Sequence, residues 1–76
     1  MTNTEMLQQA IKESGLKISA ILKQTNIKAY STLRAKIENR SEFTASEITQ
    51  LCEILNLTNE QREGIFFAND AESYSA

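Results

Sequence analysis

The sequence reads ISAILKQTNIKAYSTLRAKI from residue 18 to residue 37, and this stretch decides the fold that we expect. Apolar side chains at Ile18, Ile21 and Leu22 recur at helical spacing, which predicts a short helix from Ile18 to Thr25. Thr25 and Asn26 then favour a tight turn, because asparagine tolerates a positive φ better than most residues do. The stretch therefore begins with a short helix followed by a turn.

A second short helix is predicted from Ala29 to Glu38. Tyr30, Leu33 and Ile37 are spaced to face the core, and Ile27 would fill the space between the two helices. With that face turned inward, a rotation of about 100° per residue leaves an outward face with no acid before Glu38. This outward face comprises Lys28, Ser31, Thr32, Ala35 and Lys36, with Arg34 on its flank.

Helices are also predicted on both sides of this pair. The first is expected from Asn3 to Ser14, with a capping box of Thr2 and Glu5 and a left-handed C-terminal cap at Gly15. Two later helices are marked by the capping-box pairs Thr44 with Glu47 and Thr58 with Gln61. We therefore expect an all-α protein, with one five-helix domain over residues 1–68 and a frayed polar tail over residues 69–76.

Charge is divided unevenly along the chain, whose formal net charge is −2. Residues 16–40 carry six cations against one acid, a net charge of +5, whereas the other residues carry two cations against nine acids, a net charge of −7. Salt screens exposed charges beyond ~8–10 Å, so a polyanion meets the local cluster rather than the total charge. The basic stretch suits nucleic acid, although a lysine-rich solvated helix would show the same pattern.

Few groups in the sequence suit catalysis or metal binding. The chain has no histidine, no glycine-rich phosphate loop and no nucleophile elbow, so we expect no enzyme activity, metal or cofactor. Cys52, the only cysteine, falls on an apolar stripe and is expected to be a small buried side chain. Neither a secretion signal nor an apolar run of ~20 residues is present, so we expect a cytoplasmic protein without a membrane partner or small-molecule substrate.

Several stretches together resemble the Cro/phage-repressor (XRE-type) helix-turn-helix domain. They are ESGLK from residue 13, ISAILKQTNI from residue 18, STLRAKIENR from residue 31 and, similar to the family's fourth helix, TASEITQLCEIL from residue 44. The chain also resembles small regulators of Gram-positive phages and prophages, which tend to end near an Ile-Phe-Phe, here residues 65–67. The resemblance covers about residues 4 to 68. It implies a five-helix lambda-repressor-like fold, regulation of transcription by binding double-stranded operator DNA, and pairing as a homodimer.

The resemblance also implies roles for single residues. Lys28, Ser31, Thr32 and Lys36 match the base-reading face of the family's recognition helix, and Ala35 shares that face. Ser and Thr hydroxyls can hydrogen-bond to base edges, and lysine can reach guanine or phosphate. Contacts to the DNA backbone are expected from Lys17, Ser19, Lys23, Arg34, Arg40 and Ser41.

Alternatives remain for three residues, Tyr30, Phe66 and Phe67, and for the function itself. The connection from Thr25 to Tyr30 is one residue longer than the family's usual turn, so Tyr30 is either a core residue or a DNA contact. Phe66 and Phe67 cannot both face inward on one helix, so one is expected to close the core and the other to contact a second subunit. The rival function is a protein-interaction module with the same fold, acting as an antirepressor or phage host-takeover factor.

Overall fold

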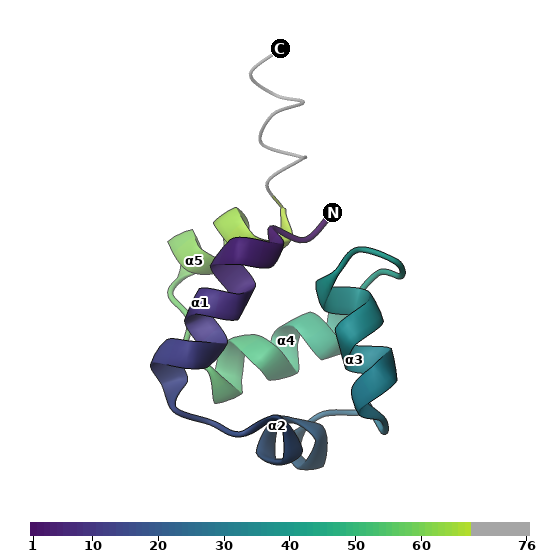
Figure 1. Cartoon of the computed structure of the whole chain (residues 1–76). Coiled ribbons are helices and arrows are strands. Elements are labelled where there is room, and N and C mark those ends of the chain that lie inside the picture. The colour runs from purple at the N-terminus through teal and green to yellow at the C-terminus, as the bar shows by residue number, and fades with distance from the viewer. Residues whose placement is uncertain (68–76) are drawn as a thin grey trace.

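The computed structural model describes residues 1–67 and is all-helical, with no strand among these residues. The described residues form five helices: α1 (Thr4–Ser14), α2 (Ile18–Gln24), α3 (Tyr30–Ile37), α4 (Ala45–Ile54) and α5 (Asn59–Phe66). In Figure 1, α4 lies in the middle of the molecule, α1 packs beside α5, and α2 and α3 lie together at the other side. The expected all-α class and the five helices are confirmed, whereas the tail expected over residues 69–76 lies outside the described residues.

A shared apolar core holds these short helices together. Every helix contributes a fully buried side chain, and so does the connection between α2 and α3: Leu7, Ile21, Ile27, Leu33, Leu51 and Ile65. Isolated helices shorter than ~12–15 residues are marginal in water. Burial of one face of each helix, rather than intrinsic helix propensity, therefore stabilises the fold.

Local capping signals decide where several helices begin or end. Thr44 and Thr58 accept a hydrogen bond from the backbone N–H three residues on, and Glu47 and Gln61 reach back to the threonine backbone. Both expected capping boxes are thus confirmed. Gly15 ends α1 at a φ of 73°, which confirms the left-handed C-terminal cap expected there.

The start of α1 differs from the expected capping box of Thr2 and Glu5. Asn3 is the N-cap residue, and its side-chain oxygen accepts a hydrogen bond from the backbone N–H of Met6. Thr2 lies outside the helix, where its N–H donates to Asn39 Oδ1 at 2.8 Å and its carbonyl accepts from Asn39 Nδ2 at 2.8 Å. Contact with the end of α3 therefore fixes Thr2 in an extended segment, and the cap falls one residue later.

Candidate nucleic-acid interface

Residues 25–29 connect α2 to α3, and side-chain hydrogen bonds close this connection. The Thr25 hydroxyl donates to the carbonyl of Ile21 at 2.9 Å and accepts from the N–H of Ile27 at 3.3 Å. The N–H of Asn26 donates to the side chain of Gln50 on α4 at 3.0 Å. Ile27 is buried between the helices, as expected.

The positive φ expected at Asn26 is wrong. Among the described residues, the non-glycine positions with a positive φ are Asn39 and Asn56. The Thr25 hydroxyl and the Gln50 side chain satisfy the backbone of the connection, so the chain turns there without a left-handed residue.

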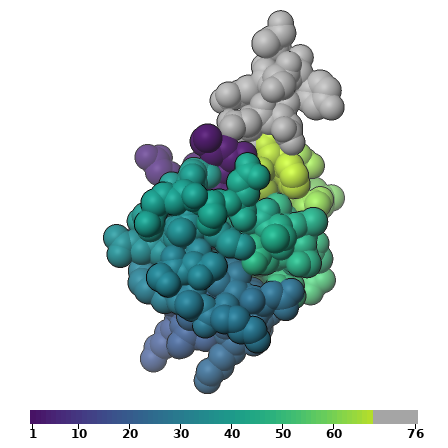
Figure 2. Space-filling view, turned by 90° about the vertical axis from the view of Figure 1, so that its right-hand side faces the viewer, coloured from purple at the N-terminus to yellow at the C-terminus, as the bar shows by residue number. Residues whose placement is uncertain are grey.

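The face of α3 that points away from the core carries small polar and basic side chains. Leu33 and Ile37 are buried, which confirms the inward side of the helix over its second half. The exposed residues in and just before α3 are Lys28, Ser31, Thr32 and Arg34, while Ala35 is partly buried. Figure 2 looks onto α3 and the loop that follows it, both of which face the viewer. This surface therefore presents hydroxyls and cations to the solvent.

Lys36 does not belong to this exposed face, so the expectation that it reads bases is wrong. Its Nζ donates a hydrogen bond to Oε1 of Glu47 on α4, and the two side chains are 12% and 9% exposed. The same Glu47 oxygen accepts a hydrogen bond from the N–H of Thr44 at 2.9 Å. Burial by itself raises the pKa of Glu47, but the hydrogen bonds from Lys36 and Thr44 outweigh it and hold the pKa below its usual value. An ion pair with α4 thus turns Lys36 inward.

Tyr30 is exposed at the beginning of α3, so the alternative that it is a core residue is wrong. About half of the residue, 51%, is accessible to solvent. It lies one turn before Leu33, where it lines an open groove of about 380 Å³ together with Ile11 of α1 and Ile18 of α2. Helical spacing predicts the direction in which a side chain points, but not whether a neighbouring element covers the end of the helix. Here the open groove leaves the Tyr30 ring accessible to solvent. The DNA contact stays a prediction.

A single carboxylate lies between two arginines at the end of α3. Arg34 Nε donates to Glu38 Oε2 at 3.0 Å, and Arg40 Nη2 donates to Glu38 Oε1 at 2.9 Å. All three side chains are exposed, and the hydrogen bond from Arg34 is the main cause that holds the pKa of Glu38 below its usual value. Sequence reasoning missed this role of Glu38, although its i,i+4 spacing from Arg34 is a signal that indicates such a pair.

The remaining side chains expected to reach a DNA backbone are exposed around α2 and after α3. They are Lys17, Ser19, Lys23, Arg40 and Ser41. Together with Lys28 and Arg34, they give residues 17–41 five exposed cations against one exposed acid, Glu38. The exposed charges of α1 and α5 are mostly acidic, and the next charged residue after Arg40 is the exposed acid Glu42. The basic surface is therefore confined to residues 17–41, which include α2 and α3.

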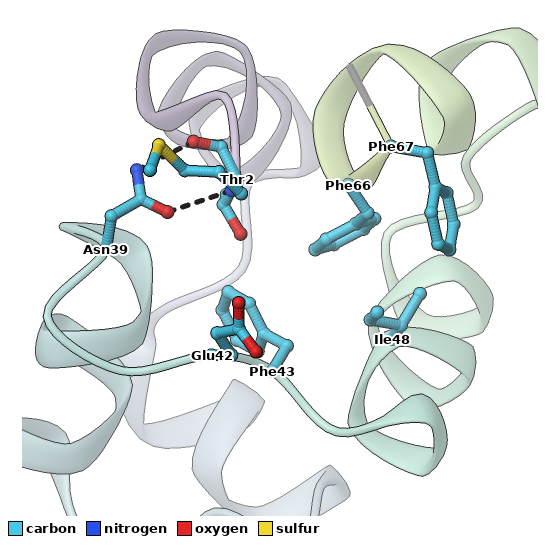
Figure 3. A pocket seen from close by; sticks show the side chains of 8 residues that line it. Thr2, Asn39, Glu42, Phe43, Ile48, Phe66 and Phe67 are labelled. Carbon is cyan, nitrogen blue, oxygen red and sulfur yellow. Dashed lines mark hydrogen bonds between the residues drawn. The ribbon is translucent and has the colours of Figure 1, made fainter. Parts of the chain in front are cut away.

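Phe66 and Phe67 differ in burial, and Phe66 is the one that closes the core. Phe66 is buried and packs edge-on against Phe43, with ring centroids 5.6 Å apart and an interplanar angle of 84°. Phe66 is therefore not available to a second subunit. Phe67 is partly buried beside Ile48 at the rim of a pocket (Figure 3), and the guanidinium of Arg62 lies 5.3 Å from its ring centroid. Phe67 stays the candidate dimer contact.

The described residues were also compared with what a reactive thiol, a metal site and a membrane-spanning helix require. Cys52 is partly buried, and burial raises the pKa of its thiol. Residues 1–67 contain no cluster of three or more His, Cys, Asp or Glu side chains that could hold a metal ion. None of the helices in this part of the chain has the length and apolar character needed to cross a membrane.

No protein-family model, curated protein or solved structure matches the chain. The function is therefore inferred from the geometry and charge of α2, α3 and the adjoining loops.

Proposed function

We propose that the chain is a sequence-specific, DNA-binding transcription regulator of the Cro/repressor type, with α2 and α3 as its helix-turn-helix. The observation that supports this most is the exposed face at the start of α3, which joins a cation to small hydroxyls: Lys28, Ser31 and Thr32. Over residues 28–40 the sequence holds one acid, Glu38, and two arginines bind its carboxylate. Such a surface attracts phosphate and offers hydrogen bonds to base edges.

In the proposed complex, α3 lies in the major groove with its N-terminal end leading, and α2 crosses the DNA backbone. Lys28 reaches guanine or phosphate, while Ser31 and Thr32 hydrogen-bond to base edges. Tyr30 is exposed at the same end of α3 and contacts DNA beside them. Phosphate contacts come from the surrounding side chains: Lys17, Ser19, Lys23, Arg34, Arg40 and Ser41.

The proposed regulator acts by occupying DNA, not by catalysis, and needs no cofactor. Two copies bind the duplex as a homodimer, because a two-fold pair reads two half-sites about one helical turn apart. Phe67 is the side chain that we assign to the contact between the copies, since it is partly exposed while Phe66 is buried.

A salt series tests the proposed function. Binding of the purified protein would be measured to a random duplex and to a duplex selected by the protein from a random library. On both duplexes the logarithm of the binding constant should fall linearly with the logarithm of salt concentration, by about 0.9 per phosphate contact. On the selected duplex, where all five exposed cations of each copy can reach phosphate, the slope should be about −4 to −5. Undetectable binding at low salt, or binding that salt does not weaken, contradicts the proposal.

A protein-interaction module is the second candidate, and the groove beside Tyr30 favours it. Ile11, Ile18 and Tyr30 offer apolar surface there, and the chain as a whole is acidic. If this candidate holds, Tyr30→Ala abolishes capture of a partner protein, whereas Lys28→Ala preserves it. The wild type and both variants then fail to bind duplex DNA. If the wild type instead binds DNA in a salt-dependent way and Lys28→Ala weakens this binding, the result supports the DNA-binding candidate.

A further inference from the structure

We propose that Glu38 is a specificity-determining residue: its carboxylate holds Arg34 and Arg40 away from phosphate until base contacts by α3 displace it. The inference rests on the proposed DNA-binding function and adds a regulating residue to it. The observation behind it is that Glu38 binds two of the five exposed cations of the basic surface. One carboxylate oxygen binds Arg34 and the other binds Arg40.

Carboxylate and phosphate compete for the same groups. Both are anionic oxygen acceptors for the N–H donors of a guanidinium, so an arginine bound to Glu38 has fewer donors left for DNA. Any donors that remain reach phosphate only with the negative charge of Glu38 nearby. Since the carboxylate lies within 3.0 Å of both arginines, it is well inside the screening length of ~8–10 Å, and it repels the phosphate that they approach.

The exposure of these pairs makes them exchangeable. The side chains of Arg34 and Arg40 are 59% and 63% exposed, and exposed ion pairs are weak. This separates them from the pair of Lys36 with Glu47, whose side chains are almost buried. A modest amount of free energy from another source is enough to move the two arginines from Glu38 to phosphate.

Base contacts supply that free energy only on a matching sequence. There, Lys28, Ser31 and Thr32 bind base edges, α3 sits deep in the groove, and both arginines exchange the carboxylate for phosphate. On an unrelated sequence these base contacts are missing, so the arginines stay with Glu38 and up to two phosphate contacts are lost. Glu38 thereby weakens binding to unrelated DNA more than binding to the matching site.

Glu38→Gln tests the inference, because it removes the charge and keeps the size of the side chain. On a random duplex the salt slope should steepen by about 0.9 for each arginine released, so by up to about 1.8. The gain in affinity over the wild type should then shrink roughly threefold per arginine between 50 and 200 mM salt. On the selected duplex the slope should change little, so the ratio of selected to random affinity falls. Adding Arg34→Gln should remove about half of the gain on the random duplex.

Glu42→Gln is the matched control. Glu42 is exposed four residues further along and has no ion-pair partner among residues 1–67, so the change in net charge is the same. Equal gains for the two variants would overturn the inference, because net charge alone would explain them. Equal gains of Glu38→Gln on both duplexes would also overturn it. A wild-type protein without salt-dependent DNA binding would instead overturn the proposed function, and the inference with it.

Discussion

At the scale of single residues, Glu47 joins two parts of the molecule through one carboxylate. It completes the capping box of α4 with Thr44 and binds Lys36 of α3. Removing one partner of a buried ion pair is costly, because it leaves the other charge buried without compensation. The pair therefore holds α3 on α4, and with it the outward face on which the proposed DNA contacts lie.

Glu47→Gln should lower the free energy of unfolding by about 3 kcal/mol, because glutamine can still cap α4 but leaves Lys36 without a counter-charge. The core of a chain this short supplies about 3–5 kcal/mol, so the variant should be barely stable. Urea denaturation followed by circular dichroism measures the change. Combining it with Lys36→Met should recover most of the loss, since the double variant no longer buries a charge without a partner. A double variant no more stable than Glu47→Gln would contradict the assignment.

The same pair predicts a dependence of stability on pH. The pKa of Glu47 is lower in the folded protein than its ordinary value of 4.5. Its contribution to stability is therefore complete above the ordinary pKa, and it is lost as the pH falls through the lower pKa of the folded state. The difference in urea midpoint between the wild type and Glu47→Gln should shrink over this acidic range. A difference that stays constant from pH 7 to pH 3 would contradict the charge pairing.

Substitutions on the proposed DNA surface should separate two roles. Thr32→Ala should cost about 1–3 kcal/mol on the selected duplex and relax the preference at particular base pairs, because Thr32 is assigned to base edges. Lys17→Ala should weaken binding to all sequences alike and reduce the salt slope by about 1, because Lys17 is assigned to phosphate. Competition binding against a set of duplexes measures both. An unchanged sequence preference in Thr32→Ala would show that the recognition face is placed wrongly.

At the scale of elements, the end of α3 is bound to the first residues of the chain. Asn39 adopts a left-handed φ of 66° just after the helix, and its side-chain amide binds both backbone groups of Thr2. Thr4 adds a hydrogen bond from its hydroxyl to the carbonyl of Ile37 at 2.6 Å, and the N–H of Asn3 donates to the carbonyl of Ile65 at 2.6 Å. The N-terminal segment thus ties α3 to α5.

Two substitutions at Asn39 should separate its hydrogen bonds from its backbone conformation. Asn39→Gly keeps the left-handed conformation at no steric cost and loses only the bonds to Thr2, so it should cost about 1 kcal/mol. Asn39→Ala should cost a further ~1–2 kcal/mol, because alanine is strained at a positive φ. Urea denaturation gives the order of stability, and amide hydrogen exchange should show that Thr2 loses its protection in both variants. Protection of Thr2 that survives in Asn39→Gly would contradict the role of the side chain.

At the scale of the whole molecule, the basic surface of α2 and α3 and the partly exposed Phe67 lie on different elements. Phe67 follows α5 and lies beside Ile48 of α4 (Figure 3). Asn39 and Glu42 of the loop after α3 line the same pocket as Phe67, whereas the side chains that we assign to base contacts, Lys28, Ser31 and Thr32, do not line it. The proposed two-fold binding to a duplex requires that both copies keep these three side chains free.

Phe67→Ala should shift the protein toward the monomer, because it removes the aromatic ring assigned to the contact between copies. Sedimentation without DNA at high micromolar concentration should show a dimer for the wild type and a smaller species for Phe67→Ala. Tyr30→Ala, which removes an exposed ring on α3, is the control and should sediment as the wild type does. A monomeric wild type at that concentration would contradict the proposed dimer.

The sequence by itself determined the five helices, the caps at Gly15, Thr44 and Thr58, and the concentration of cations around α2 and α3. These features depend on side chains within about four residues of one another along the chain, so local rules capture them. Only the tertiary structure decided that Lys36 turns inward to Glu47, that Tyr30 is exposed and that Thr2 pairs with Asn39. Each of these depends on which element comes to lie opposite, and spacing along one helix carries no information about a partner on another.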